Sequence, residues 1–386
     1  MAWRAILLSS LVLLQACATS SELRTARAQF KQGSTDAALE TLDTASVSSR
    51  DTLLLLLDKA LVAQAAGNYE TSIIALENAY QLVDDLDYIS ARDQTTALLS
   101  NDWAIRYSGE YSERLWIHTF QMINYLMLNQ PDGAAVEARR AVKLYADHAD
   151  VLDDDLFTRY LMILSFDAAG QRDSAMVEYR KLSDHLNATS LKAPGIAGRE
   201  LVLFVASGFI EPKLPGDILV DVNARISFPY YPDGYHREPE IDVLQGASIL
   251  DASRVDTQLL SVARSALSKR GNSIAARHAL RLAAKYSLAE SIADEDPLAG
   301  GIARLLLVAM EQADTRSWET LPANLALVRV ALPDDTDSVE VRINSTAGPT
   351  PNLHSRQVKL DLNDAARQFR LIRVGVAGST HTLPSP

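Results

Sequence analysis

The sequence predicts an α+β protein, with an N-terminal all-α array of paired helices followed by a mixed region that holds a small, mostly antiparallel sheet or sandwich and about three helices. Three observations predict this fold class. A turn containing glycine recurs at a fixed interval in the first half, residues 201–206 form a short apolar run, and residues 339–344 alternate between apolar and polar side chains. At 386 residues the chain is also too long for one compact core, since single cores stop growing at about 250–300 residues.

The first seventeen residues have the features of a bacterial lipoprotein signal. Arg4 gives a positive start, and residues 5–16 are mostly apolar but too few to cross a bilayer, which takes about 20 helical residues. The motif LQAC at 14–17 resembles the lipobox of bacterial lipoproteins, and Cys17 is the only cysteine in the chain. The resemblance implies that residues 1–16 are a signal peptide that is removed, and that Cys17 carries covalent lipid, palmitate included. The alternative is an ordinary signal peptide with a chance cysteine.

The predicted lipid anchor suggests a location. In lipoproteins of two-membrane bacteria an Asp after the cysteine tends to retain the protein at the inner membrane, so Ala18 favours the outer membrane, facing the periplasm. No later segment reaches 18 apolar residues in a row, and we expect the rest of the chain to be soluble. The net charge of −12 disfavours nucleic acid as a partner. A single cysteine excludes an internal disulfide framework and a Cys-rich zinc site.

A repeating pattern predicts the helical array, which we place at residues 17–190. Gly33 and Gly67 lie 34 residues apart, the period of tetratricopeptide repeats, and Gly170 begins a further copy, the last in the chain, with the same offsets. In each copy a small residue follows the turn by five positions and a larger residue comes four positions later. These pairs are Ala38 with Leu42, Ser72 with Leu76, and Ala175 with Tyr179.

A degenerate copy, the third in chain order, places Gln130 at the glycine position, followed by Ala135 and Arg139. Four helix pairs across about 20–188 therefore resemble tetratricopeptide repeats, although no copy has the full consensus. Chance helical hairpins at similar spacing are the alternative, and they would also be all-α. The repeat interpretation predicts that Ala135 and Ala175 are buried where two helices meet.

The turns of the second and third pairs, at Gly67 and Gln130, lie 63 residues apart, which is 29 more than one period. We therefore assign residues 84–112 to an insertion that folds against the array. The stretch 107–145 that follows resembles a signature of an uncharacterised family of bacterial repeat-containing lipoproteins. The resembling elements are YSGE at 107–110, ER at 113–114, NYL at 124–126 and VEARR at 136–140. The family implies a lipid-anchored repeat protein and no settled activity.

The second half, residues 198–376, predicts strands and helices. Besides 201–206 and 339–344, strands are expected at 218–228, 325–332, 356–362 and 369–376, and helices lie between about 255 and 312. Strands near 201–228 can join a sheet made from 320–376, in which case the helices are an insertion. We expect residues 377–386 to be a flexible tail.

No motif for catalysis, for a cofactor or for metal binding was found, and the seven histidines are scattered without a second histidine at i+4. We therefore assign no catalytic or metal-binding residue and expect no cofactor other than the lipid. The acidic run at 147–155 lacks the spacing of a calcium loop and is typical of a helix start. Glu113, His118, Glu137 and Arg139 form a possible polar network, in which Glu113 or Glu137 is the expected partner of Arg139.

Helical repeats often bind partners on their concave surface. Aligning the copies by their turns places six residues there, a mixture of aromatic anchors and polar groups that suits a peptide groove: Phe120, Asn124, Phe157, Tyr160, Leu164 and Asp167. The alternative is that all six pack under the insertion. Our first hypothesis is a non-enzymatic protein–protein interaction scaffold. An accessory factor for cell-wall or envelope assembly is the second, and a glycan or peptide hydrolase with paired carboxylates is the third.

Overall fold

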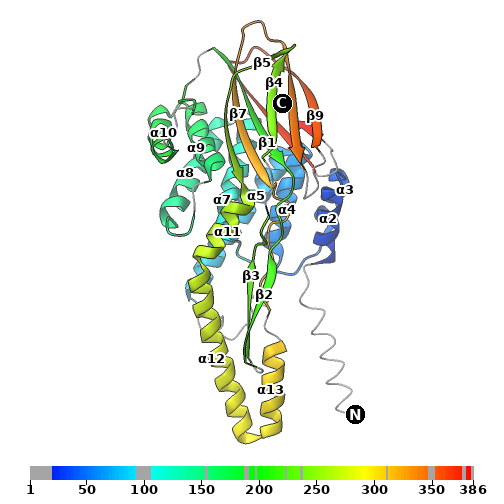
Figure 1. The fold of residues 1–386 in the computed structure, drawn as a ribbon, viewed down its shortest axis with the longest axis vertical. Helices are drawn as coiled ribbons and strands as arrows, with labels where there is room; N and C mark the ends of the chain where they lie inside the picture. The colour runs from blue at the N-terminus through cyan, green and yellow to red at the C-terminus, as the bar shows by residue number, and fades with distance from the viewer. Residues whose placement is uncertain are drawn as a thin grey trace.

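The computed structural model describes residues 20–92, 106–152, 155–186, 191–195, 198–221, 224–234, 238–309, 312–346, 353–375 and 380–383. The body has three layers: a helical array, a five-stranded sheet packed on it, and a four-stranded sheet on the outside. The array passes behind the sheets from α2 and α3 on one side to α10 on the other (Figure 1). The predicted α+β fold class is confirmed.

In the part of the chain that the structure describes, the array consists of four helix pairs, as predicted. They are α2 (Ser21–Lys31) with α3 (Thr35–Thr44), α4 (Thr52–Ala65) with α5 (Tyr69–Arg92), α7 (Tyr111–Met127) with α8 (Pro131–Asp147), and α9 (Leu156–Ala168) with α10 (Arg172–Leu186). Between residues 20 and 186 the described ranges contain no strand. At the predicted helix start, Asp155 caps α9 by accepting a hydrogen bond from the Thr158 amide at 3.1 Å.

The four pairs share one turn geometry, and it corrects the predicted register of the third copy. Gly33, Gly67 and Gly170 have positive φ, and Asn129 takes the same conformation at φ 53°. Asn129, one residue before Gln130, is therefore the counterpart of the glycines. In each turn the amide of this residue bonds the carbonyl three positions back, and the next amide bonds the carbonyl five positions back.

With the register moved by one, Ala134 and Ala138 occupy the positions that we had assigned to Ala135 and Arg139. Both are fully buried, whereas Arg139 is exposed. Ala135 and Ala175 are also fully buried, so that prediction is confirmed, although Ala135 lies next to the position we had assigned it.

The predicted insertion at 84–112 is partly wrong, because its first residues belong to helix α5. Helix α5 continues to Arg92, and α7 begins at Tyr111. Residues 93–105 lie outside the described part of the chain. The extra spacing of this copy is therefore taken up partly by α5, which has 24 residues.

The two sheets form a sandwich. Their strands are β1 (Arg199–Ser207), β4 (Glu240–Gln245), β5 (Ser248–Ile249), β6 (Ala252–Gln258), β7 (Asn324–Leu332), β8 (Ser338–Thr346), β9 (Leu353–Asp361), β10 (Arg367–Val374) and β11 (Thr380–Leu383). The five-stranded sheet has the order β11-β10-β1-β7-β6, and the four-stranded sheet has the order β5-β4-β8-β9. All pairs are antiparallel except β1 with β10.

Strand β1 is central and is buried on both faces. Leu201, Leu203 and Val205 join the core between the two sheets, while Val202 and Phe204 join the core against the array. This double burial explains why β1 has a continuous apolar sequence and not an alternating one. As anticipated, β1 joins the C-terminal sheet, and the intervening helices are an insertion.

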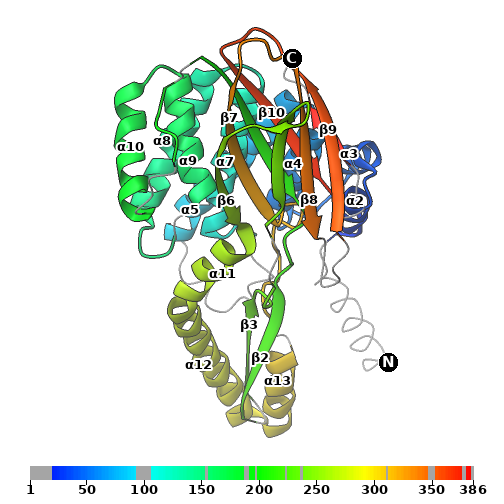
Figure 2. The same ribbon diagram turned by 45° about the horizontal axis from the view of Figure 1, so that its top comes forward.

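Three helices separate β6 from β7, namely α11 (Leu259–Lys269), α12 (Gly271–Glu295) and α13 (Pro297–Ala309). The predicted helical region began too early, because residues 255–258 belong to strand β6. Helices α12 and α13 project from the body together with the hairpin of β2 (Leu214–Asp221) and β3 (Ala224–Tyr230), and we call these four elements the arm (Figures 1 and 2). The predicted flexible tail is also partly wrong, because β11 pairs with β10.

Candidate functional site

The inner face of the array is filled by another part of the same chain. Residues 313–323, which we call the strap, precede β7 and lie against α2, α4 and α7. Trp318 is fully buried, and its ring meets Phe120 edge-on at 5.7 Å between ring centroids. The backbone amide of Trp318 donates to the Glu113 carboxylate at 2.7 Å. The strap thus occupies the surface where we expected a partner.

The open groove predicted from six residues is therefore wrong. Five of them are at most 1% exposed: Phe120, Asn124, Phe157, Tyr160 and Leu164. Three of them contact the C-terminal half: Phe120 meets Trp318, the backbone amide of Phe157 bonds Thr257 of β6, and the hydroxyl of Tyr160 bonds Arg329 of β7. Asp167, at the end of α9, is the one member of the set that lines an open cleft.

Asn124 belongs to a buried network within the array. Its side-chain oxygen accepts a hydrogen bond from Gln64 at 2.7 Å, and its side-chain nitrogen donates to Ser72 at 2.8 Å. These contacts tie α7 to α4 and α5. Removal of Asn124 would leave buried polar partners unsatisfied, so this residue supports the fold of the array.

Arg27 and Asp58 of the array hold the strap in place. Arg27 of α2 contacts Asp58 of α4 and Glu319 of the strap, both at 2.6 Å. Asp58 also accepts a hydrogen bond from Thr320 at 2.9 Å. Because Asp58 is fully buried, its charge needs these partners.

The segment at 107–114 forms a second buried junction, between the array and the root of the arm. Glu110 contacts Lys213 at 2.9 Å and also Arg270, which lies between α11 and α12. Burial alone would raise the pKa of Glu110, but Lys213 and Arg270 together lower it to about 2. Glu113 accepts hydrogen bonds from Tyr107 and from the amide of Glu110. Each of these groups has partners that orient the arm's root, which is a structural role.

The predicted polar network exists only in part. Nδ1 of His118 lies 2.7 Å from the Glu137 carboxylate, and both residues are buried. Arg140, and not Arg139, completes this pair by contacting Glu137 at 2.9 Å. Arg139 instead donates to Gln171 at 2.9 Å on the exposed side, as the shifted register of α8 requires. Glu113 belongs to the separate cluster at the arm's root.

Sequence reasoning missed a charged row on the sheet face that meets the array. Glu200 of β1 accepts hydrogen bonds from Arg329 of β7 at 3.0 Å and from Arg367 of β10 at 2.8 Å. Tyr160, assigned to the groove, is part of this row, because its hydroxyl accepts from Arg329 at 3.1 Å. The alternation Arg367, Phe369, Leu371 would have extended the predicted last strand by two residues and revealed Arg367.

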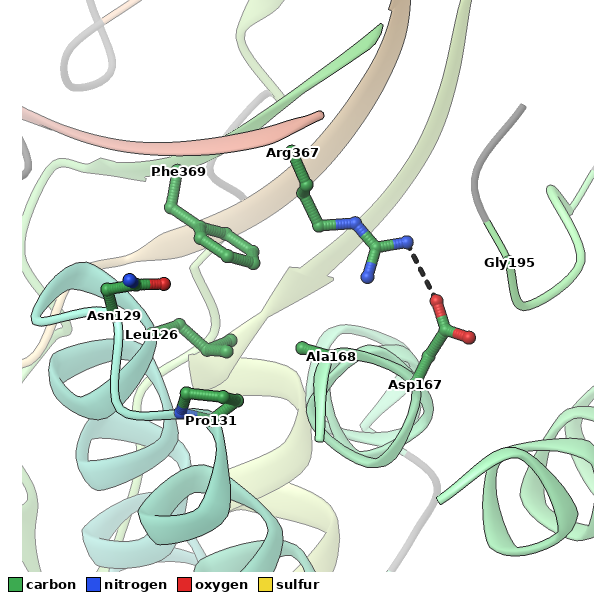
Figure 3. A pocket seen from close by; sticks show the side chains of 8 residues that line it. All are labelled: Leu126, Asn129, Pro131, Asp167, Ala168, Gly195, Arg367 and Phe369. Atoms are coloured by element: carbon green, nitrogen blue, oxygen red, sulfur yellow. Dashed lines mark hydrogen bonds and ion pairs between the residues drawn. The ribbon is translucent and has the colours of Figure 1, made fainter. Parts of the chain in front are cut away.

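A cleft of about 330 Å³ opens at the edge of this row, between the array and β10 (Figure 3). It is lined by Leu126, Asn129, Pro131, Asp167, Ala168, Gly195, Arg367 and Phe369. Arg367 and Asp167 form an ion pair of 2.7 Å across its side. The cleft combines four apolar side chains with three polar groups, which are the Arg367 guanidinium, the Asp167 carboxylate and the Asn129 side-chain amide.

Most of the exposed large hydrophobic side chains in the described part of the chain lie on the arm. Among the described residues, nine of the thirteen large hydrophobic side chains that are exposed lie on it: Leu214, Ile218, Leu219, Tyr230, Leu280, Tyr286, Leu288, Leu298 and Ile302. Leu219 and Leu298 are 76% and 75% exposed. The other four are scattered singly over α5, α8, α10 and β5.

Cys17, the predicted lipid site, lies outside the described residues. None of the helices in the described ranges has the length and hydropathy needed to cross a bilayer. Comparison with protein-family models, with curated proteins and with solved structures finds no match for this chain. The candidate sites therefore rest on geometry and chemistry alone.

Proposed function

We propose that the protein is a non-enzymatic interaction protein, anchored by lipid on Cys17 to the periplasmic face of the outer membrane, that binds a protein partner through the arm. The concentration of exposed apolar side chains on the arm supports this proposal most strongly. Apolar patches of this kind typically mark interaction sites on soluble folds. The array, whose inner face is filled by the strap, then acts as the rigid support of the arm.

The charges at the tip of the arm favour a protein over a lipid surface. Glu290, Asp294, Glu295 and Asp296 are all exposed, in the last turns of α12 and directly before α13, the helix that contains Leu298. An anionic bilayer would repel this tip. A partner with an apolar patch and a basic rim would complement it, and such complementarity favours specific association.

Site-specific photo-crosslinking in cells tests the arm. A photoreactive residue in place of Leu298 should give a discrete protein adduct, whereas one in place of Val136, exposed on α8, should give none. The change Leu219→Ser should weaken the Leu298 adduct, and the matched change Ile74→Ser on α5 should leave it intact. Lipid adducts alone at position 298, or equal protein adducts at both positions, would refute a protein-binding arm.

The anchor is tested separately. Cys17→Ala should move the full-length protein from the membrane fraction to the soluble fraction, because it removes the proposed acyl site. Metabolic labelling with a fatty-acid analogue should mark the wild-type chain and not the variant. A variant that still needs detergent for release would contradict the anchor and leave the arm hypothesis standing.

A further inference from the structure

The geometry points to a binding site in the cleft for a ligand that ends in a carboxylate and carries an apolar group beside it. This inference is independent of the arm, since the cleft lies between the array and β10. Three features of the cleft support it: one free donor group, a positive local charge and apolar walls.

The donor group is part of Arg367. Its side chain is 6% exposed, its Nε donates to Glu200 at 2.8 Å, and one terminal nitrogen, Nη2, donates to Asp167 at 2.7 Å. The other terminal nitrogen, Nη1, has no hydrogen-bond partner among the described residues. Figure 3 shows it pointing between Phe369 and Ala168 into the cleft. Two carboxylates thus fix the guanidinium plane before any ligand arrives, which lowers the entropy lost on binding.

The surrounding charges favour an anion. Arg367, Arg329 and Lys192 carry three positive charges, and Glu200 and Asp167 carry two negative ones, so the connected group has one positive charge in excess. Arg172 adds a further cation at the rim. Its guanidinium lies beside Gly195, which lines the cleft: a Cβ atom added to Gly195 would be 3.8 Å from the guanidinium. A carboxylate that accepts from Nη1 would balance the excess, and guanidinium–carboxylate contacts are among the stronger hydrogen bonds in proteins.

The walls define the rest of the ligand. Leu126, Pro131, Ala168 and Phe369 present apolar surface around the guanidinium (Figure 3). A volume of about 330 Å³ is at the lower end of small-ligand pockets. It suits one or two residues of a peptide with an apolar C-terminal side chain, or a free apolar amino acid. Both sources offer the same carboxylate beside the same apolar group.

Calorimetric titration of the full chain distinguishes the sources. The probes are N-acetyl-Ala-Leu with a free carboxylate, the same dipeptide with a C-terminal amide, and free leucine. We expect the free acid, free leucine or both to bind and the amide to bind at least 10-fold more weakly. Binding of the dipeptide acid identifies a peptide terminus, and binding of leucine alone identifies an amino acid.

Two variants and a matched control test the location without removing a charge. Ala168→Leu fills the cleft and should weaken binding at least 10-fold. Ala169→Leu makes the same change at the neighbouring position, which does not line the cleft, and should bind like the wild type. Arg367→Lys keeps the charge but loses the planar donor set, so it should also bind at least 10-fold more weakly. Equal binding of acid and amide, unchanged binding by Ala168→Leu, or no heat signal at 10 mM of either acid would overturn the proposal.

Discussion

Arg373 is buried at the end of β10 without a polar partner among the described residues. Its two terminal nitrogens have no hydrogen bond there, and its guanidinium lies 4.6 Å from the centroid of the Phe209 ring. Burial lowers the pKa of Arg373 to about 9. A cation–π contact with this ring offsets only part of the lost hydration.

Replacing this cation with an apolar side chain of similar length should therefore stabilise the protein. We expect Arg373→Met to raise the free energy of unfolding by about 1–3 kcal/mol. Urea denaturation followed by circular dichroism measures this change in the free energy of unfolding. Arg329→Met is the matched control: it removes a buried arginine that does have partners, Glu200 and Tyr160, and should destabilise. A loss of stability in Arg373→Met would show that its charge is compensated.

Glu110 contributes stability that depends on pH. Its pKa is lowered from an ordinary value of 4.5 to about 2, so the folded state favours the ionised form. The contribution of the ion pairs with Lys213 and Arg270 is complete above pH 4.5 and is lost as the pH falls through 2. Glu110→Gln should thus lower the unfolding midpoint at pH 6, and the difference from wild type should shrink as the pH approaches 2. A difference that is constant over this range would contradict the assignment.

At the level of elements, the turns explain what the sequence could and could not predict. Glycine marks the left-handed turn position in three copies, and these copies were placed correctly. Asn also tolerates this conformation, but Asn occurs in many other conformations as well, so its presence does not identify a turn. The third copy was therefore placed one residue late. That shift moved Arg139 onto a buried position in the prediction, although it is exposed in the structure.

The corrected register of α8 can be tested by mutation. Ala134→Leu should overpack the α7–α8 contact and cost about 1–3 kcal/mol of unfolding free energy, and Ala175→Leu should do the same in the last pair. Val136→Leu, on the exposed side of α8, is the control and should change stability by less than about 0.5 kcal/mol. Thermal unfolding of the three variants measures these changes in stability. Equal effects at 134 and 136 would mean that the register is still wrong.

The whole molecule is less divisible than its sequence suggests. Helical and strand patterns change near residue 190, which predicts two folding units. In the structure, one hydrophobic cluster contains Leu57 and Phe120 of the array together with Phe204 and Trp318 of the second half. The groove residues were mistaken for a binding surface because periodicity shows which helix face is apolar but cannot show what covers it. Long-range partners such as the strap leave no local pattern.

The shared core predicts one cooperative unfolding transition. Far-UV circular dichroism and tryptophan fluorescence should give the same midpoint in urea, because the larger of the two hydrophobic clusters is built from residues of both halves. A chain that ends at residue 190 should lose this transition and expose apolar surface to a fluorescent dye. Separate transitions for the two probes would instead indicate two independently stable halves.

The beginning of α2 limits how far the protein could act from a membrane. Arg27 secures α2 to the body, and only three residues separate Cys17 from Ser21. At about 3.3–3.6 Å per residue this tether is at most roughly 14 Å long, whereas α12, with 25 residues at 1.5 Å each, is roughly 37 Å. With a lipid on Cys17, the distance from the membrane at which the protein could contact a partner would depend on the length of the arm and not on a flexible linker. The search volume would then be a thin layer beside the bilayer, and a partner fixed in the same membrane would be met at high effective concentration.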